Sequence, residues 1–559
     1  MLFTNEQLKS IFVDGGFLTA EEFEKARKTA ALRQVPVTDS IVEFGYLSDS
    51  EVGALLAAEK GLFFVDLSRE KVNQNTLLLI PEKVALAKRV VAYKKDKEKV
   101  WVAMANPDDY EFIKLLEKKI GPPLKIVYAT PFGIEGVLKG YQKDLLLQAT
   151  ELIERMSKKP QEQDIVKLVD LLIRSAHENR ASDIHIEPEE EYVIVRFRID
   201  GVMHEMLRYP ITNHDKVVFR IKILGRMRTD EHAQAQDGRF EFKSEEGRFN
   251  LRVSIIPITR GENVVMRILS EKFQRLRLED LGFLEHDLAK IKKVSKLPHG
   301  MIIASGPTGS GKTTSLYAVI NVLNKPDVNI TTIEDPVEYD IKGVRQIQVN
   351  PRTNLTFEAG LKSIVRQDPD VIMVGEIRDP QTAGIAVNAA LTGHLVMSSM
   401  HANDAATTFP RLFEMGVEPF LVASSVNIVV SQRLVRKICN HCIESISIDA
   451  EMAKAIESDK DLAAMFKKIN KSKGITKARV YKGKGCEVCS DTGYSGRMGI
   501  FEILEVTETL RPLIVNKATS DQIRDAAIAE GMKTMMEDGL MKVFKGQTTM
   551  EEVLRATKA

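Results

Sequence analysis

The alternation of apolar and polar positions changes its period along the chain. Between about residues 300 and 435, short apolar runs such as MIIAS (301–305) alternate with helix-like segments, which is typical of a doubly wound, largely parallel sheet. Residues 164–270 begin with a helix-like run and continue with alternating segments such as DIHIEP and FNLRVSIIPI, which predict an antiparallel sheet in an α+β domain. We therefore expect an α/β fold class with several domains.

The first sixty residues contain an internal repeat, because residues 12–23 (FVDGGFLTAEEF) resemble residues 41–52 (IVEFGYLSDSEV). Each copy opens a helix with a capping box, in which a hydroxyl and a carboxylate satisfy free backbone N–H groups. The two boxes are Thr19 with Glu22 and Ser48 with Glu51, and a third near the chain end is Thr549 with Glu552. The repeat predicts a small helical module with two similar halves.

The next eighty residues mix strand-like segments (LFFVDL, KVWVAMA and LKIVYAT) with helical ones, so we expect a small α/β domain. A helix-like run ending in the polar stretch SKKPQEQD follows and predicts a linker. The predicted divisions are a helical module (1–60), an α/β domain (61–143), a linker (144–163), an α+β domain (164–272) and a doubly wound α/β domain (273–559). Within the last lie a tetracysteine subdomain (437–492) and a C-terminal helical region (505–559).

Length and charge limit the classes of function. A chain of 559 residues is too long for one hydrophobic core. Its net charge of +1 weighs against a nucleic-acid motor, since such binding depends on neutralising phosphates. MLFTNEQLKS has no apolar signal region, and the longest apolar stretch is too short to span a bilayer. We therefore expect a cytoplasmic protein that is at most peripheral to a membrane, with no nucleic-acid partner.

The strongest chemical signal follows the apolar run MIIAS. The sequence GPTGSGKT (306–313) matches GxxxxGK[ST] between a predicted strand and a predicted helix, which is the context of a phosphate-binding loop. Lys312 should reach the β- and γ-phosphates of ATP, and Thr313 should ligate Mg²⁺. The candidate binding residues are Gly306, Pro307, Thr308, Gly309, Ser310, Gly311, Lys312, Thr313 and Thr314.

Hydrolysis also needs carboxylates for the metal and the attacking water, and three later segments offer candidates. The apolar strand in DPDVIMVGEIRD ends at Glu376, which we interpret as the metal-side carboxylate. ITTIEDPVEY ends in the acidic cluster Glu334, Asp335 and Glu338. TGHLVMSSMHANDA places His394 and His401 at the two ends of an apolar strand. Each segment is a weak signal alone, and their order after the phosphate loop strengthens them.

These segments resemble the Walker A, Asp box, Walker B and His box of the secretion ATPase superfamily, in particular its type IV pilus assembly and type II secretion branch. The resemblance continues through SDIHIEP, VRFRIDGVM and QDGRF and covers roughly residues 160–559. It implies that residues 273–559 form a RecA-like ATPase domain, preceded by a PAS-like α+β domain. It also implies that Glu334 positions the attacking water, Glu376 coordinates Mg²⁺ through water and His401 contacts the γ-phosphate.

The same resemblance implies a homohexamer whose sites lie between protomers. Arginines of the preceding domain would then close over the phosphates of a neighbouring subunit. Arginines in or near the strands of that domain include Arg196, Arg198, Arg220, Arg239, Arg252 and Arg267. Most arginines on strands are simply solvated, but Arg198, Arg239 and Arg252 match the family pattern best. Which of the three is the finger stays open.

All four cysteines of the chain fall in two CxxC pairs, Cys439 with Cys442 and Cys486 with Cys489. In a cytosolic chain this spacing favours a metal over disulfides. Two such pairs can enclose one tetrahedral Zn²⁺, and four thiolates leave no open catalytic position. Unliganded cysteines and an iron–sulfur cluster are the alternatives. We expect His441 to be a bystander, and the family resemblance supports structural zinc.

The repeat of residues 12–52 resembles the N-terminal domain of pilus assembly ATPases. Some versions of that domain bind cyclic di-GMP through motifs that open with Arg-Leu-Gly, but the corresponding segments here, QLKS and VTDS, lack the arginine. We therefore expect docking on inner-membrane assembly proteins rather than nucleotide sensing. Deletion of residues 1–140 should abolish membrane recruitment.

The leading hypothesis is a hexameric motor at the cytoplasmic face of the inner membrane that drives type IV pilus extension through a membrane platform protein. Its association with the membrane would be peripheral, through partners. A type II secretion ATPase with the same engine is the nearest alternative. A DNA-translocating ATPase and an inactive scaffold are the other classes. The expected cofactors are ATP, Mg²⁺ and Zn²⁺.

Overall fold

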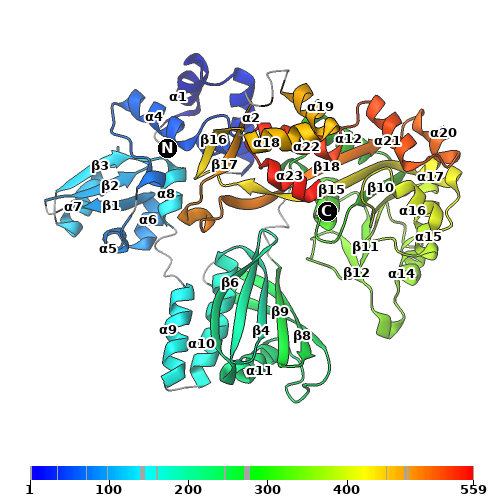
Figure 1. Cartoon of the computed structure of the whole chain (residues 1–559), viewed down its shortest axis with the longest axis horizontal. Coiled ribbons are helices and arrows are strands. Elements are labelled where there is room, and N and C mark those ends of the chain that lie inside the picture. Colours follow the sequence, from blue (N-terminus) through cyan, green and yellow to red (C-terminus); the bar gives the residue numbers. More distant parts are fainter. Residues whose placement is uncertain are drawn as a thin grey trace.

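The computed structural model describes residues 3–33, 36–70, 72–96, 98–121, 123–138, 145–158, 162–244, 247–269, 277–448, 450–470, 475 and 478–557. Within these ranges the strands form four sheets. Figure 1 shows the N-terminal elements at the left, a β-rich domain below, and a larger sheet with its helices at the right.

The N-terminal helices form the predicted module with two similar halves. Both predicted capping boxes are confirmed: the Glu22 carboxylate accepts from the Thr19 backbone N–H at 2.9 Å, and the Glu51 carboxylate accepts from that of Ser48 at 2.7 Å. Phe12, Phe23, Ile41 and Val52 are among the residues of the module's core. The elements are α1 (Asn5–Lys9), a π-helical turn (Ser10–Asp14), α2 (Ala20–Arg33), α3 (Val37–Glu43) and α4 (Asp49–Lys60).

A small α/β domain follows, with a three-stranded sheet in the order β1-β2-β3. The predicted strands KVWVAMA and LKIVYAT are confirmed as β2 and β3, whereas LFFVDL forms only a single bridge, from Phe64 to Tyr128. The elements are α5 (Gln74–Leu77), α6 (Glu82–Lys88), β1 (Val90–Lys95), β2 (Val100–Met104), α7 (Tyr110–Ile120), β3 (Leu124–Tyr128) and α8 (Pro131–Leu138).

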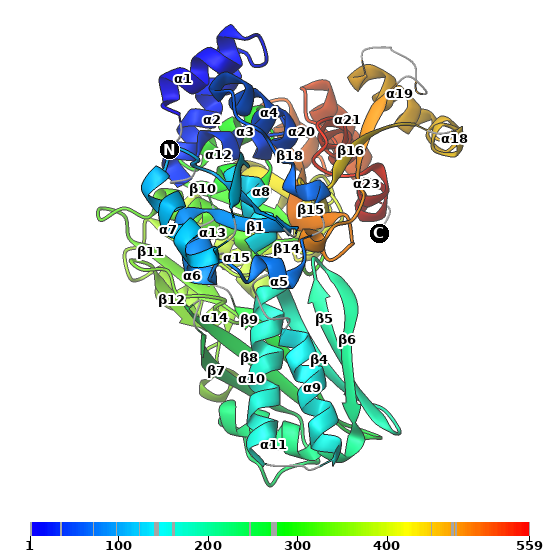
Figure 2. The same cartoon turned by 90° about the vertical axis from the view of Figure 1, so that its left-hand side faces the viewer.

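The predicted α+β domain is confirmed as an antiparallel sheet in the order β6-β5-β4-β9-β8-β7. Helices cover one face of it (Figure 2). The elements are α10 (Glu162–Glu178), β4 (Ala181–Pro188), β5 (Tyr192–Ile199), β6 (Val202–Pro210), α11 (His214–Leu224), β7 (Gln236–Ser244), β8 (Gly247–Ile258) and β9 (Gly261–Leu269).

The structure corrects our prediction of a linker over residues 144–163. Helix α9 (Leu145–Lys158) occupies most of this range and packs along α10. Its Leu152 and Met156 are buried in the core of the α+β domain. The helix is therefore part of that domain, because its apolar face completes the domain core.

The large sheet has the order β12-β11-β13-β14-β10-β15-β18, and its strands are parallel apart from the last, β18. Every residue of β10 and β14 is buried, which explains why their sequences, GMIIAS and LVMSSM, contain no charged residue. The strands are β10 (Gly300–Ser305), β11 (Ile330–Glu334), β12 (Arg345–Gln348), β13 (Val371–Val374), β14 (Leu395–Met400), β15 (Val426–Ile438) and β18 (Tyr494–Glu505).

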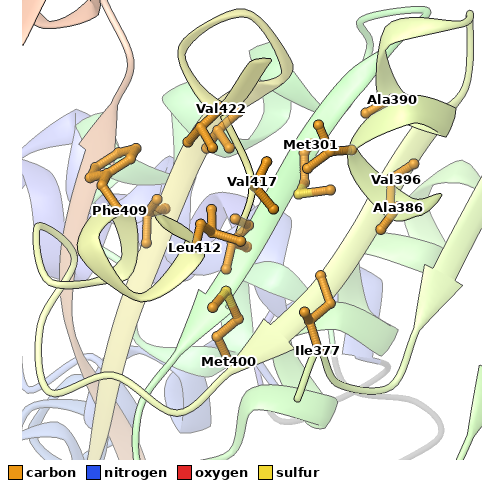
Figure 3. Packing of buried hydrophobic residues seen from close by; sticks show 14 of the residues in the cluster. Met301, Ile377, Ala386, Ala390, Val396, Met400, Phe409, Leu412, Val417 and Val422 are labelled. Atoms are coloured by element: carbon orange, nitrogen blue, oxygen red, sulfur yellow. The ribbon is translucent and has the colours of Figure 1, made fainter. Parts of the chain in front are cut away.

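Helices cover both faces of this sheet, as the doubly wound pattern predicts. One side is sealed by the cluster in Figure 3, where Met301 and Met400 of the strands meet Phe409 and Val422 of the helices. The helices are α12 (Glu285–Val294), α13 (Lys312–Leu323), α14 (Phe357–Ile364), α15 (Pro380–Leu391), α16 (Thr408–Glu414) and α17 (Pro419–Ser425).

The C-terminal third adds a cysteine-bearing insertion and a helical end. The insertion lies between β15 and β18 and contains β16 (Ile443–Ser447), α18 (Ala450–Ser458), α19 (Lys460–Ile469) and β17 (Arg479–Gly483). The end contains α20 (Leu510–Val515), α21 (Ser520–Ala529), α22 (Met535–Phe544) and α23 (Met550–Thr557). No helix in the described part of the chain is long and apolar enough to cross a membrane.

The capping box predicted at Thr549 forms only in part. The backbone N–H of Glu552 donates to the Thr549 hydroxyl at 3.4 Å. The Glu552 carboxylate instead accepts from the Arg436 backbone at 2.9 Å and from the guanidinium groups of Arg436 and Arg555. These charged donors hold the pKa of Glu552 down at about 2 against the effect of burial. The cap therefore also fastens α23 to β15.

Candidate active site and metal centre

The loop between β10 and α13 has the backbone shape of a phosphate-binding loop. Gly306, Gly309 and Gly311 have φ angles of 147°, 77° and 90°, which residues with a Cβ rarely adopt. A Cβ at Gly306 would also lie 2.6 Å from the Ser310 hydroxyl and 2.7 Å from the Gln432 carbonyl oxygen. The predicted strand, loop and helix are thus present, with Thr313 and Thr314 in the first turn of α13.

Lys312 folds back over this loop. Its ammonium group donates to the carbonyl oxygens of Gly306 at 2.7 Å and Pro307 at 3.0 Å. Burial lowers the pKa of Lys312, and the negative charge of Glu376 raises it. Lys312 and Glu376, which the sequence separates by 64 positions, therefore share one electrostatic environment.

Glu376 and His401 meet at the carboxyl ends of two neighbouring parallel strands. Glu376 follows β13 and His401 follows β14, which pair in register. A Glu376 carboxylate oxygen lies 3.4 Å from His401 Nε2 and 2.5 Å from Arg378 Nε. The carboxyl edge of a parallel sheet is where α/β folds bind ligands. Arg378 is an addition to the residues we predicted, although it lies in the Walker B segment.

Glu334 occupies a buried position at the end of β11, with its side chain only 2% exposed. The carboxylate accepts from the hydroxyls of Tyr317 and Thr332 and from the Gln346 amide. Burial raises the pKa of Glu334, while these three hydrogen bonds lower it. The candidate catalytic carboxylate is therefore positioned by α13 and β12, on a strand that β13 and β14 separate from β10.

His394 lies at the opposite end of β14. Its Nδ1 atom is 3.0 Å from the Ala389 carbonyl oxygen at the end of α15. Of the two histidines in the His box segment, only His401 is at the carboxyl edge of the sheet.

A buried glutamine supports the phosphate loop. The Gln432 side chain is 1% exposed; its amide N–H donates to the Ser310 carbonyl at 2.7 Å, and its oxygen accepts from the Ser315 hydroxyl at 2.8 Å. Sequence reasoning missed this residue. The signal was available, since Gln432 and Arg433 interrupt an apolar strand.

The loop after His401 is held by charged residues from the C-terminal elements, which we also did not predict. Arg433 donates to the Asn403 carbonyl at 3.0 Å, and Arg524 pairs with Asp404 at 2.7 Å. The Glu502 carboxylate accepts from the Ala405 backbone at 3.0 Å, and burial raises its pKa. Strands β15 and β18 and helix α21 thereby fix the segment that carries His401.

The three predicted arginines lie in one row across the α+β sheet. Arg239 pairs with Arg252, Arg252 with Arg267, Arg267 with Asp183, and Asp183 with Arg198. Residues directly opposite each other share a face of the sheet, so Arg267 joins the three that we chose.

Three members of this row have defined partners, and one of them is Arg267, whose guanidinium donates to the Asp183 carboxylate at 2.8 Å. Arg252 approaches Glu338, in the segment after Glu334, with 4.0 Å between nitrogen and oxygen. Arg198 donates to the Gly201 carbonyl at 3.1 Å and lies 3.7 Å from Asp183. Within one chain, Arg252 thus reaches from the arginine row to the ATPase domain.

The four cysteine sulfurs converge on one point. Sγ–Sγ distances are 3.8 Å for Cys439 with Cys486, 3.8 Å for Cys442 with Cys489 and 3.7 Å for Cys486 with Cys489. A tetrahedral ion with metal–sulfur bonds of about 2.3 Å requires sulfurs about 3.8 Å apart. All four sulfurs lie within 4.8 Å of one another, so the cluster could hold one metal ion.

Comparisons with known proteins agree with this geometry. Residues 158–555 match the family Type II/IV secretion system protein, and residues 61–146 match the MshEN domain. The chain is 35% identical over 572 residues to the type IV pilus assembly ATPase PilB of Myxococcus xanthus, an alignment that covers 99% of each protein. It is 42% identical over 413 residues to the type II secretion system ATPase E of Vibrio cholerae, covering 74% of this chain and 78% of the relative.

A solved structure shares the fold. The ATPase DotB of Yersinia pseudotuberculosis superposes with a TM-score of 0.52 over 70% of this chain and 93% of its own, at 18% identity. The range that matches the family, residues 158–555, includes the phosphate loop, the carboxylates, the arginine row and the cysteines. The chain therefore belongs to the Type II/IV secretion system protein family.

Proposed function

We propose that this chain is a motor ATPase that couples ATP hydrolysis to type IV pilus assembly. The observation that carries the proposal is the meeting of Lys312, Glu376 and His401 at one edge of the sheet, in a chain that aligns with a pilus assembly ATPase over almost its whole length. The three residues account for the chemistry of ATP hydrolysis, and the alignment accounts for the domain content.

Each residue at this edge has a role in the proposed reaction. The loop N–H groups and Lys312 bind the phosphates of ATP. Thr313 and Glu376 would hold Mg²⁺, and His401 would contact the γ-phosphate. When bound, Mg²⁺ would supply positive charge that neutralises the phosphate oxygens. The glycine conformations and the proximity of Glu376 to Lys312 fit this set of ligands.

Glu334 positions the attacking water in this proposal and accepts its proton. A base works best when its pKa approaches the working pH, and burial raises the pKa of Glu334 in that direction. The hydrogen bonds from Tyr317 and Thr332 hold the carboxylate in one orientation. Substitution by glutamine keeps the shape and removes the base.

The arginine row completes the site from a neighbouring protomer of a homohexamer. A transferring phosphoryl group carries charge on three oxygens, and a guanidinium placed there stabilises it. Arg239, Arg252 and Arg267 form a run of adjacent cations on one sheet face, and Arg198 lies at its far end beyond Asp183. Such a run suits a polyanion presented by another subunit.

The cysteine cluster binds structural Zn²⁺. Its sulfur separations suit a tetrahedral ion, and all four ligands are thiolates, which leaves no position for a substrate. Zinc would join the end of β15 to the turn before β18 and so close the insertion that contains α18 and α19.

The motor would act at the cytoplasmic face of the inner membrane, through a platform protein. The alignments favour pilus assembly, since pilus assembly ATPases cover 88% to 99% of this chain, whereas type II secretion proteins cover 70% to 88% of it. To test this, the full chain is co-purified with the platform protein of the pilus machine and with that of a type II secretion machine. Selective retention by the pilus platform supports the proposal, and selective retention by the secretion platform contradicts it.

A further inference from the structure

Helix α8 of the N-terminal region lies against the cysteine cluster of the ATPase domain. The rings of Phe132 and His441 stack with their centroids 4.0 Å apart and 7° between their planes. His441 lies between Cys439 and Cys442. Figures 1 and 2 both show α8 beside the orange segment that carries the second cysteine pair.

The same face of α8 also contacts the turn that contains the second cysteine pair, Cys486 and Cys489. Gly136 is one helical turn beyond Phe132, so the two residues share a face. A Cβ at Gly136 would lie 3.4 Å from the His441 ring and 3.4 Å from a methyl group of Val488. Val488 lies between Cys486 and Cys489. One residue from each CxxC turn therefore contributes to the surface that receives α8.

A second contact places the helical module on the same domain. A Cβ at Gly45, in the loop after α3, would lie 3.5 Å from the Lys545 carbonyl oxygen after α22. The neighbouring Tyr46 lies near enough to Glu285 of α12 for that charge to help raise its pKa, after burial and Glu22. The N-terminal region thus touches the ATPase domain through both of its parts.

The shape of the α8 surface depends on the sulfurs. The backbone N–H groups of Cys486 and Gly493 donate to the Cys489 sulfur at 3.2 Å, and sulfur contacts of 3.8 Å join the two turns. A metal ion shared by the four sulfurs would fix the separation of the two turns. His441 and Val488 would then be held at the spacing that α8 contacts.

We propose that the two CxxC turns, with His441 and Val488, form a docking site for α8, and that metal binding and docking are coupled. This rests on the proposed metal site. Coupling of this kind is reciprocal: the factor by which bound metal strengthens docking equals the factor by which docking strengthens metal binding. The cysteine cluster would thereby connect the N-terminal region, which we expect to contact membrane proteins, to the ATPase domain.

The contact is tested in the full chain by hydrogen exchange of the α8 amides. His441→Ala removes one ring of the stack from the ATPase side, and Gly136→Leu inserts a side chain between α8 and the turns. Loss of one stacked ring should speed α8 exchange by about two- to tenfold. His299→Ala, at an exposed histidine of the same domain, is the matched control and should leave exchange unchanged. Unchanged α8 exchange in both test variants overturns the docking site.

Coupling is tested by removing the metal with a chelator and restoring it with Zn²⁺. Removal should speed α8 exchange, and Zn²⁺ should reverse the effect. His441→Ala should weaken zinc affinity, measured by competition with a chelator, by no more than the factor by which removal of zinc weakens docking in the wild type. Equal α8 exchange with and without zinc overturns the coupling. A chain that binds no zinc overturns the coupling and the proposed metal site together, while the His441→Ala comparison still decides whether the docking contact exists.

Discussion

At the scale of single residues, the protonation of Glu334 decides whether it can accept a proton. Burial raises its pKa above the ordinary value of 4.5, and the hydrogen bond from Tyr317 lowers it. The active form is deprotonated, so the rate should fall as the pH drops through this raised pKa. The acid side of the pH–rate profile should therefore lie above pH 4.5.

The phenol of Tyr317 gives a direct check. Tyr317→Phe removes one hydrogen bond that stabilises the carboxylate, so the pKa of Glu334 should rise and the acid limb of kcat should move to higher pH. Tyr494→Phe, at a tyrosine whose hydroxyl bonds to Thr549, should leave the limb in place. An acid limb that does not move in Tyr317→Phe would count against Glu334 as the base.

Gln432 is a residue-scale test of how the phosphate loop is held. Gln432→Leu leaves the Ser310 carbonyl and the Ser315 hydroxyl without buried partners. We expect the free energy of unfolding to fall by about 1–3 kcal/mol and the KM for ATP to rise. Denaturation and steady-state kinetics measure the two effects, with Gln367→Leu at an exposed position as the control. An unchanged KM would show that the loop keeps its shape without Gln432.

The phosphate loop could be predicted from sequence because its chemistry is local. Eight consecutive residues between a strand and a helix contain the turn glycines and Lys312. The arginine row could not be derived in the same way, because it depends on the register of five strands. The family resemblance named three of its members, whereas Arg267 could be assigned to the row only from the strand pairing in the structure.

At the scale of elements, the central strands could be predicted because they are buried on both faces. Partly buried segments led to wrong predictions. β10 and β14 are buried at every position and contain only apolar residues, glycine and serine. LFFVDL has a similar composition, yet its Phe63 is 72% exposed and the segment makes only one bridge. The polar stretch that contains Pro160 suggested a linker. The apolar face of α9 contacts α10, and no local sequence pattern predicts such a contact.

Helix α9 can be tested as part of the α+β domain. Leu152→Ala removes buried methyl groups and should lower the free energy of unfolding by about 2–5 kcal/mol. Glu151→Ala, on the exposed side of the same helix, should change it little. Hydrogen exchange of α10 in the full chain gives the local readout. Equal exchange in the two variants would restore the linker interpretation.

At the scale of the whole molecule, the proposed motor has active sites that are shared between protomers. Lys312→Ala and Arg252→Ala chains should each be inactive alone. When they are mixed, about a quarter of the interfaces in a random homohexamer would combine an intact loop with an intact arginine, so activity should return in part. A mixture of Lys312→Ala with Glu334→Gln should stay inactive, because both changes lie in the same half of the site. No recovery in the first mixture would place Arg252 in the site of its own chain, near Glu338.

The most direct test of the proposed ATPase activity, with Glu334 as the base, is ATP turnover by the purified full chain. The comparison is between wild type, Glu334→Gln and the control Glu358→Gln, at an exposed glutamate of α14. We predict that wild type and Glu358→Gln hydrolyse ATP at similar rates and that Glu334→Gln lowers kcat by about 100-fold or more. Turnover by Glu334→Gln within a few-fold of wild type, or no turnover by wild type, would contradict the account.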